Sequence, residues 1–255
     1  MKKTLINTTP EDFPRALRPI IFGKIYDSSS SPEARVYFIE SAGAYLKRAP
    51  LGTLYREAKM DEYFHSLGLS GKVLSYINEG EDWLLTEAVR GEDATAECYL
   101  ESPGRLAALM GEQLRRLHET DFSTCPITDR MSDYFDLAEK NYRAGIYDLS
   151  YSGLSSAEKA WDIVNHGRDS LESRVLLHGD FCLPNIILKD WKLSGYIDLG
   201  SGGVGDRHVD LFWGAWTLAY NLKTDKYRDI FFDAYGRELV DEDKLDIIAA
   251  AECFG

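Results

Sequence analysis

The chain has 255 residues, of which 44% are hydrophobic and 28% charged, as expected for a globular protein with one large domain or two modest lobes. Its net charge of −13 and the lack of a Lys/Arg cluster argue against a nucleic-acid partner. No apolar run approaches the roughly 20 residues of a membrane span, and the polar start of the chain argues against a secretory signal. Without such a run, we expect no membrane partner. Four scattered cysteines without a C-x-x-C pair indicate reduced thiols in a cytoplasmic protein.

The first part of the chain is predicted to be rich in strands. The predicted elements are strands at residues 35–39 and 44–47, a helix at 53–67, and strands at 72–77 and 83–89. Thr53 is the expected N-cap of the helix. The polar run Arg90-Gly91-Glu92-Asp93 breaks this pattern. We therefore expect an N-terminal lobe over residues 1–90, with a hinge near residues 87–92.

The second part, residues 91–255, is predicted to be a larger and mainly helical lobe. The predicted elements are helices at 103–118, 131–142, 156–164, 209–220 and 227–235, a strand at 174–177, and a hairpin formed by 186–188 and 194–197. A loop is expected at 145–156. The sequence contains no internal repeat and no low-complexity segment.

Three polar residues after the predicted strand at 174–177 have the spacing that phosphoryl transfer requires. Asp180 lies in a turn, Asn185 follows Pro184, and Asp198 ends a short strand before a run of glycines. A kinase needs one carboxylate to orient the attacking hydroxyl, and oxygen ligands that hold Mg²⁺ on the phosphates. We expect Asp180 to take the first role, and Asn185 and Asp198 the second.

No competing catalytic motif is found in the sequence. The five histidines lack metal-ligand spacing, and neither a Gly-x-Ser-x-Gly elbow nor a Walker loop is present. A nucleotide-binding protein without catalysis is one alternative, although it would have no need for an acid that orients a hydroxyl.

Several motifs together resemble the aminoglycoside 3′-phosphotransferases, which belong to the protein-kinase-like small-molecule kinases. The matching segments are His178-Gly179-Asp180-Phe181-Cys182-Leu183-Pro184-Asn185, Ile197-Asp198-Leu199-Gly200, Gly205-Asp206-Arg207-His208-Val209-Asp210, Ala44-Tyr45-Leu46-Lys47, Leu54-Tyr55-Arg56-Glu57, Leu84-Leu85-Thr86-Glu87-Ala88 and Glu252-Cys253-Phe254. The resemblance covers nearly the whole chain. It implies an α+β bilobal protein-kinase-like fold with ATP or GTP and Mg²⁺ as cofactors, and we expect a monomer or a weak homodimer.

The resemblance also implies roles for residues of the nucleotide site. Lys47 is expected to contact the α- and β-phosphates and to pair with Glu57, because an ammonium group is a compact charge suited to that task. Ser30 and Ser31 fall in the loop that covers the nucleotide. The backbone groups of Glu87 and Ala88 are expected to bond the nucleobase. Asp210 is expected to brace the catalytic loop, and His178 to be structural.

The acceptor is expected to be cationic, with the 3′-hydroxyl of an aminoglycoside as the site of transfer. The resemblance points to Glu252 and Phe254 at the chain end and to Asp148 and Asp162 beside the expected loop as acceptor-binding residues, since charge-assisted hydrogen bonds are strong. The chain departs from the family pattern in three places. Ser201 stands where an arginine is common, and few acidic residues follow Asp148. At the chain end, Ala251 stands where an acidic residue is common, and Gly255 extends the chain beyond the aromatic residue. These departures leave a kinase for another small alcohol open as an alternative.

Overall fold

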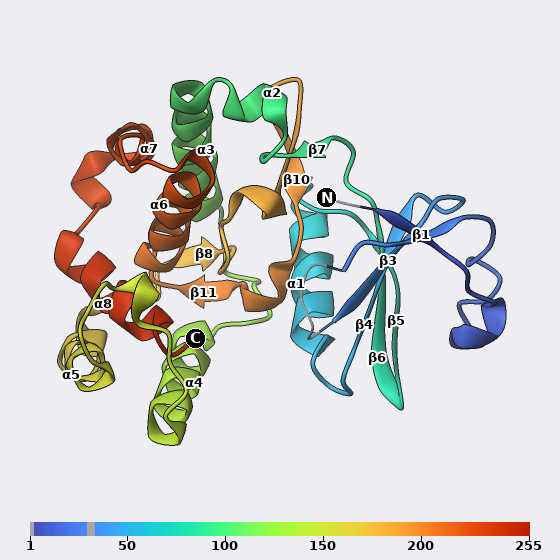
Figure 1. The fold of residues 1–255 in the computed structure, drawn as a ribbon, viewed down its shortest axis with the longest axis horizontal. Helices are drawn as coiled ribbons and strands as arrows, with labels where there is room; N and C mark the ends of the chain where they lie inside the picture. Colours follow the sequence, from blue (N-terminus) through green and yellow to red (C-terminus); the bar gives the residue numbers. More distant parts are fainter. Residues whose placement is uncertain (1–2, 30–33) are drawn as a thin grey trace. The chain divides into compact units, whose positions relative to one another are not determined.

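The structure is a computed structural model that describes residues 3–29 and 34–255. The chain divides into two compact units (Figure 1). Unit 1 holds residues 1–93 and 186–200, and unit 2 holds residues 94–185 and 201–255. This division places residues 186–200 with the N-terminal part of the chain, whereas the sequence predicted one boundary near residue 90.

Unit 1 is built on a six-stranded antiparallel sheet with the order β1-β2-β3-β4-β6-β5. Its elements are β1 (Thr4–Ile6), η1 (Pro10–Asp12), β2 (Ile25–Asp27), β3 (Arg35–Ile39), β4 (Ala44–Ala49), α1 (Tyr55–Ser66), β5 (Val73–Glu79), β6 (Glu81–Glu87), β7 (Glu92–Asp93), β9 (Ile186–Lys189) and β10 (Lys192–Tyr196). Side chains alternate across β4, so Leu46 packs into a core with Ile39 and Leu85. Lys47 pairs in register with Leu84, and Leu84 packs with Ala58 of α1. Lys47 therefore faces α1.

The N-terminus of α1 differs from the prediction. Thr53 does not cap the helix, because its hydroxyl donates to the carbonyl of Pro50 at 2.7 Å. The buried carboxylate of Asp82 on β6 instead accepts from the backbone N–H of Leu54 at 2.8 Å. A side chain far away in the sequence thus satisfies one of the donors that a helix start leaves open, and a local N-cap pattern does not reveal it.

The hairpin β9–β10 belongs to unit 1 through its backbone pairing. Its turn residues Asp190 and Trp191 have φ of 52° and 61°, as in the two-residue turns whose twist suits antiparallel strands. β9 pairs with β7, and the N–H of Tyr196 donates to the carbonyl of Leu69 at 2.7 Å. These long-range bonds explain why the hairpin groups with the N-terminal part of the chain.

Unit 2 is mainly helical. Its elements are α2 (Glu97–Leu100), α3 (Pro103–His118), α4 (Arg130–Ala144), η2 (Leu149–Tyr151), α5 (Ala157–Gly167), η3 (Arg168–Ser170), β8 (Val175–Leu177), η4 (Leu183–Asn185), β11 (Gly203–Gly205), α6 (His208–Leu222), α7 (Arg228–Tyr235), η6 (Arg237–Leu239) and α8 (Glu242–Glu252), and η5 (Leu199–Ser201) lies at the boundary of the units. The predicted helices at 103–118, 131–142, 156–164, 209–220 and 227–235 are all present. The prediction missed α8, although Asp241 caps it by accepting from the N–H groups of Asp243 and Lys244.

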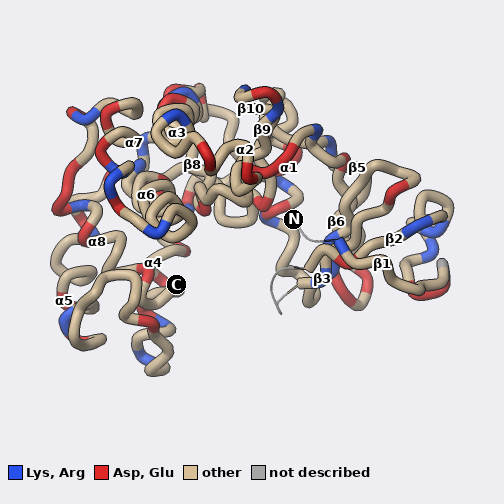
Figure 2. Tube along the Cα trace, turned by 45° about the horizontal axis from the view of Figure 1, so that its top comes forward, with Lys and Arg blue, Asp and Glu red and all other residues tan. Residues whose placement is uncertain are grey.

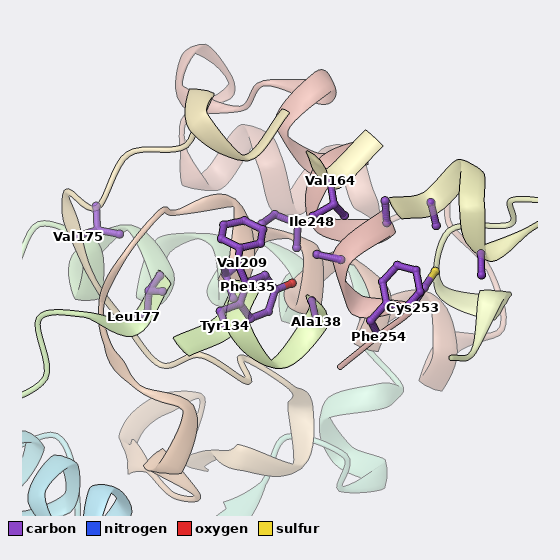
Figure 3. Packing of buried hydrophobic residues seen from close by; sticks show 14 residues of the cluster. Tyr134, Phe135, Ala138, Val164, Val175, Leu177, Val209, Ile248, Cys253 and Phe254 are labelled. Atoms are coloured by element: carbon purple, nitrogen blue, oxygen red, sulfur yellow. The ribbon is translucent and has the colours of Figure 1, made fainter. Parts of the chain in front are cut away.

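The core of unit 2 joins α4, α5, α6 and α8 to β8 (Figure 3). Tyr134 and Phe135 of α4 lie in this cluster together with Val209 of α6 and Ile248 of α8. The chain end also enters it, since Phe254 is only 1% exposed. Burial of such a large side chain contributes on the order of 1.5–3 kcal/mol, so the core fixes the end of α8 and the residues that follow it.

Charged residues of both signs are interspersed along the two units (Figure 2). Within the described part of the chain, no helix is both long and apolar enough to cross a membrane.

The contact between α3 and α7 provides a test of the fold, because α3 carries glycines in two different surroundings. A Cβ at Gly111 would lie 2.3 Å from the carbonyl oxygen of Phe231, whereas a Cβ at Gly104 would meet only the end of the Ile230 side chain at 3.7 Å. We expect Gly111→Ala to lower the free energy of unfolding by about 1–3 kcal/mol through overpacking. Urea denaturation measures this change.

Gly104→Ala is the matched control in the same helix. It should leave the free energy of unfolding unchanged or raise it by up to about 1 kcal/mol, because alanine is the better helix former. Equal stability of the two variants would contradict the close α3–α7 contact.

Candidate active site

A first group of candidate site residues lies in unit 1 and is centred on Lys47. Its Nζ donates to Oε1 and Oε2 of Glu57 at 3.0 and 2.8 Å and to Oδ1 of Asp198 at 2.8 Å. β4 supplies the lysine, α1 supplies Glu57, and Asp198 follows β10. The predicted Lys47–Glu57 pair is therefore present, and the structure adds Asp198 as a second partner of the lysine.

The charges around Lys47 keep it protonated. Burial alone would lower the pKa of Lys47, but the carboxylates of Glu57 and Asp198 outweigh that effect and raise it. Asp61, one turn beyond Glu57 on α1, is 7% exposed. Burial, followed by the charge of Glu57, raises the pKa of Asp61 well above its ordinary value. One lysine thus lies among three carboxyl groups, and the sequence analysis had not singled out Asp61.

Asp198 has a backbone conformation that is unusual for a residue with a side chain. Its φ is 61°, in the left-handed region, where aspartate is tolerated better than most residues. Its side chain is 51% exposed although one oxygen is bound by Lys47. Strain of this kind is frequent at functional sites, so the conformation is consistent with a carboxylate held in place for a ligand.

A second group of candidate site residues lies in unit 2, on the loop after β8. The amide nitrogen of Asn185 donates to the backbone carbonyl of Asp180 at 3.1 Å and to its Oδ2 at 2.8 Å. Gly179 has a φ of 84°, and a Cβ there would lie 1.9 Å from the carbonyl oxygen of Ser201. Only glycine fits that position. The loop therefore presents the Asp180 carboxylate in a fixed orientation.

Asp210 braces this loop from α6, as predicted. Its Oδ2 accepts from the N–H of His178 at 2.8 Å, and its Oδ1 accepts from the N–H of Gly179 at 2.7 Å. His118 lies 3.1 Å from Oδ2 through Nε2, and its Nδ1 lies 2.9 Å from the hydroxyl of Tyr235. Burial lowers the pKa of His118 despite the attraction of Asp210. A neutral His118 that donates from Nε2 and accepts from Tyr235 satisfies both contacts.

His178 is fully buried next to the loop. The N–H of Asp180 approaches its Nδ1 at 3.3 Å, and its ring packs edge-on against Phe181 with centroids 6.2 Å apart. This environment fits the structural role predicted for His178. The sequence analysis missed His118 and Tyr235, which lie on α3 and α7, far from the motif in sequence.

The residues expected to hold Mg²⁺ have suitable donor atoms. Because the amide nitrogen of Asn185 bonds Asp180, its carbonyl oxygen is the atom directed to other partners, and Asp198 supplies a carboxylate. Over residues 3–29 and 34–255, no group of three or more His, Cys, Asp or Glu side chains is placed to hold a metal ion. Mg²⁺ bound to a nucleotide uses one or two protein ligands together with the phosphates, and the oxygen atoms of each residue are of the kind that such a ligand needs.

Glu252 lies in a buried position at the end of α8. Its Oε1 accepts from the hydroxyl of Tyr134 at 2.8 Å and from the indole N–H of Trp213 at 3.0 Å. Burial raises the pKa of Glu252 to about 7, although both hydrogen bonds act to lower it. The other predicted residue of the chain end, Phe254, packs its ring edge-on against Tyr142 and Trp161. It belongs to the core cluster of unit 2 (Figure 3).

The remaining acids predicted to bind the acceptor are exposed. Asp148 caps η2 by accepting from the N–H of Ser150 at 2.9 Å, and its own N–H donates to the carbonyl of Cys253 at 2.8 Å. Asp162 lies on the exposed side of α5. Asp148 therefore fixes its loop to the chain end, which is the segment that also carries Glu252.

The residues expected near the nucleobase lie at the end of β6. The N–H of Glu87 donates to the carbonyl of Lys72, and that of Ala88 donates to the carbonyl of Gly43, each at 2.9 Å. Because these two N–H groups already have acceptors, nucleobase contacts through them would require those bonds to break. The predicted loop residues Ser30 and Ser31 lie outside the described part of the chain.

Comparison with known proteins adds to this geometry. The model of the phosphotransferase enzyme family matches residues 29–248. A protein of Lactococcus lactis named probable aminoglycoside 3′-phosphotransferase is 46% identical over 100% of this chain and 99% of its own length. The crystal structure of an aminoglycoside 3′-phosphotransferase of type VIII is 26% identical, with a TM-score of 0.80 over 96% of this chain and 98% of that one.

A more distant solved structure shares the fold. It is an aminoglycoside phosphotransferase of Streptomyces rimosus in complex with ADP and streptomycin. It is 21% identical, covers 86% of this chain and 90% of its own, and has a TM-score of 0.73.

The buried Glu252 predicts a pH dependence of stability. Its folded-state pKa of about 7 lies above the ordinary 4.5, so the folded protein holds a proton that the unfolded chain releases between these values. The free energy of unfolding should therefore fall as the pH rises from 5 to 8, by at most about 3 kcal/mol at about 1.4 kcal/mol per pH unit. Glu252→Gln removes this contribution. Urea denaturation at several pH values should show the variant gaining stability relative to wild type as the pH rises.

Glu112→Gln, at an exposed position of α3, is the control and should follow wild type at every pH. A difference between Glu252→Gln and wild type that stays constant from pH 5 to 8 would show that Glu252 does not hold the extra proton.

Proposed function

The chain belongs to the phosphotransferase enzyme family, and from this premise we propose that it transfers the γ-phosphoryl group of ATP to the 3′-hydroxyl of an aminoglycoside. The main support for this reaction is the position of the Asp180 carboxylate. Asn185 donates a hydrogen bond to it, and Asp210 braces the loop on which it lies. The protein is an enzyme with an α+β protein-kinase-like fold, which confirms the fold and the enzyme class predicted from the sequence.

In the proposed reaction, Asp180 is the residue that acts on the acceptor. Its carboxylate orients the hydroxyl and accepts its proton while the hydroxyl oxygen forms a bond to the γ-phosphorus. The bond between that phosphorus and the β–γ bridging oxygen breaks, and ADP leaves with the electron pair. Transfer is direct, without a covalent enzyme intermediate. The bond from Asn185 to Oδ2 of Asp180 supports a fixed position for the base.

Lys47 is proposed to hold the α- and β-phosphates. Its charge is secured by Glu57 and Asp198, so it remains an ammonium group at neutral pH. Asn185 and Asp198 are proposed as the protein ligands of Mg²⁺. Bound Mg²⁺ would neutralise charge on the phosphates as the transition state forms. We also propose a cytoplasmic location, consistent with free cysteines and with the use of ATP.

The acceptor is proposed to be polycationic. The relative with 46% identity carries the name of an aminoglycoside 3′-phosphotransferase, and the net charge of −13 favours cationic ligands. Acids near the chain end, among them Glu252 and Asp148, supply carboxylates in the same part of unit 2.

A panel of acceptors in a coupled ADP-release assay tests this proposal. Kanamycin and neomycin should be turned over with KM values in the micromolar range, whereas choline, homoserine and simple amino sugars should give little ADP. Mass spectrometry and NMR of the product should place one phosphate on the 3′-oxygen. The absence of turnover with every aminoglycoside would refute the acceptor class.

Asp180→Asn tests the assigned base. We expect its turnover to fall by at least about 100-fold, since general base catalysis contributes on the order of 10²–10⁴, while ATP binding stays close to wild type. Asp246→Asn, an exposed aspartate of α8, should keep full activity. Wild-type turnover in Asp180→Asn would show that another group accepts the proton.

A further inference from the structure

A continuous set of aromatic side chains in unit 2 has no role in the reaction described above. Trp213, Trp216 and Tyr220 follow one another along α6, and Tyr151 of η2 lies against the first two. The ring centroids of Trp213 and Trp216 are 5.4 Å apart, and those of Trp216 and Tyr220 are 5.0 Å apart in a stacked arrangement with an interplanar angle of 10°. We call these four residues the aromatic cluster.

The aromatic cluster lies on a face of α6 that is not its buried face. The buried residues of the helix are His208, Val209, Asp210, Leu211, Gly214, Thr217 and Leu218. Trp216 is only partly buried, and Tyr220 is 58% exposed. Trp213 and Tyr151 pack against the core cluster of unit 2, whereas Trp216 and Tyr220 extend beyond it. A row of large aromatic rings that are partly or fully exposed, next to a catalytic loop, is typical of a ligand-binding surface.

The aromatic cluster adjoins the residues that act on the acceptor. The indole N–H of Trp213 donates to Glu252 at 3.0 Å. Thr217, next to Trp216 in the chain, accepts through its hydroxyl from the N–H of Leu183 in the catalytic loop at 3.2 Å. Burial raises the pKa of Tyr151, and the carboxylates of Asp148, Glu252 and Asp180 raise it further. The cluster therefore shares its surroundings with Asp180, the proposed base.

The chemistry of the aromatic cluster suits an aminated sugar. The C–H face of a sugar ring packs on an aromatic ring, and an ammonium group is attracted electrostatically to the ring face. The protein already shows such a contact, because Nζ of Lys223 lies 4.2 Å from the centroid of Tyr220. Glu252 adds a carboxyl group at the Trp213 end of the cluster. The rings of the aromatic cluster can contact the apolar face of a ligand, and the Glu252 carboxyl group can bind its ammonium group. Both features suit a ligand that is apolar on one face and also cationic.

We propose that the aromatic cluster, next to Glu252, forms a wall that binds an aminated sugar ring of the phosphoryl acceptor. This inference rests on the proposed function and names aromatic residues that select its substrate. In this chain, stacking on tryptophan and tyrosine supplies part of the recognition that a larger set of carboxylates would otherwise supply. Asp148, the acid of the loop at residues 145–156, acts on the Tyr151 hydroxyl through its charge.

Binding of the acceptor at the wall should also change the protonation of Glu252. An ammonium group placed beside Glu252 favours its ionised form, so binding near pH 7 should release a proton from the protein. The groups that face Glu252 are Tyr134 from α4, Trp213 from α6, Arg130 from α4 and Asp180 from the catalytic loop. Of these, Arg130 and the two hydrogen-bond donors favour the charged form, whereas Asp180 opposes it.

Trp216→Leu and Tyr220→Ala test the wall in the full-length protein. We expect Trp216→Leu to raise the KM for kanamycin at least tenfold and Tyr220→Ala to raise it severalfold. The KM for ATP should stay within twofold of wild type in both variants. Trp216→Phe, which keeps a ring, should recover most of the affinity. Phe22→Ala removes an aromatic side chain that is 61% exposed in unit 1, and it should behave as wild type. Thermal melting confirms that each variant is folded.

Isothermal titration of kanamycin into the protein without nucleotide provides a readout that does not depend on turnover. Titrations in two buffers with different ionisation enthalpies should show proton release by wild type at pH 7 and a smaller release by Glu252→Gln. Unchanged kanamycin affinity in both Trp216→Leu and Tyr220→Ala would overturn the wall while leaving the proposed function intact. Binding by wild type that weakens in Trp216→Leu, without any ADP release, would support the wall and refute the phosphotransfer.

Discussion

Two consecutive backbone N–H groups, those of His178 and Gly179, donate to the two oxygens of one carboxylate, Asp210, which is itself fully buried. A buried charge is stable only where hydrogen bonds replace its hydration. The loop after β8 meets that requirement, so the loop and the carboxylate stabilise each other. Gly179, one of the two donors, has a left-handed φ of 84°. Any change that moves Asp210 therefore acts on backbone groups directly next to Asp180.

The support for Asp210 comes from elements that the motif does not contain. His118 on α3 contacts it from one side, and Tyr235 on α7 orients His118. The side chains of α3 and α7 pack closely enough to leave room only for glycine at position 111. Helix packing in unit 2 is thus connected to the loop through a short series of polar contacts, which explains why buried polar groups are retained there.

The parts of the site that sequence could predict are those encoded by local motifs. Asp180, Asn185 and Asp210 lie within about thirty residues, and the Lys47–Glu57 pair follows from a strand and the next helix. The parts that it missed depend on contacts between distant segments. Asp82 replaces Thr53 as the cap of α1, and Tyr134 and Trp213 reach Glu252 from other helices. Helix α8 was missed for a different reason, because its N-cap and apolar spacing were present in the sequence but were not interpreted.

The carboxyl groups around Lys47 in unit 1 outnumber the positive charges, which favours binding of a cation beside them. Lys47 is the partner of both Glu57 and Asp198, and Asp61 is buried one turn beyond Glu57. With every group ionised, three negative charges would face one positive charge in a site of low dielectric. Burial and the charge of Glu57 raise the pKa of Asp61, a direction that reduces this excess. In the proposed function, a divalent cation that arrives with the nucleotide would reduce it further at Asp198, the most exposed of the partners of Lys47, and would leave the charge of the lysine available for the phosphates.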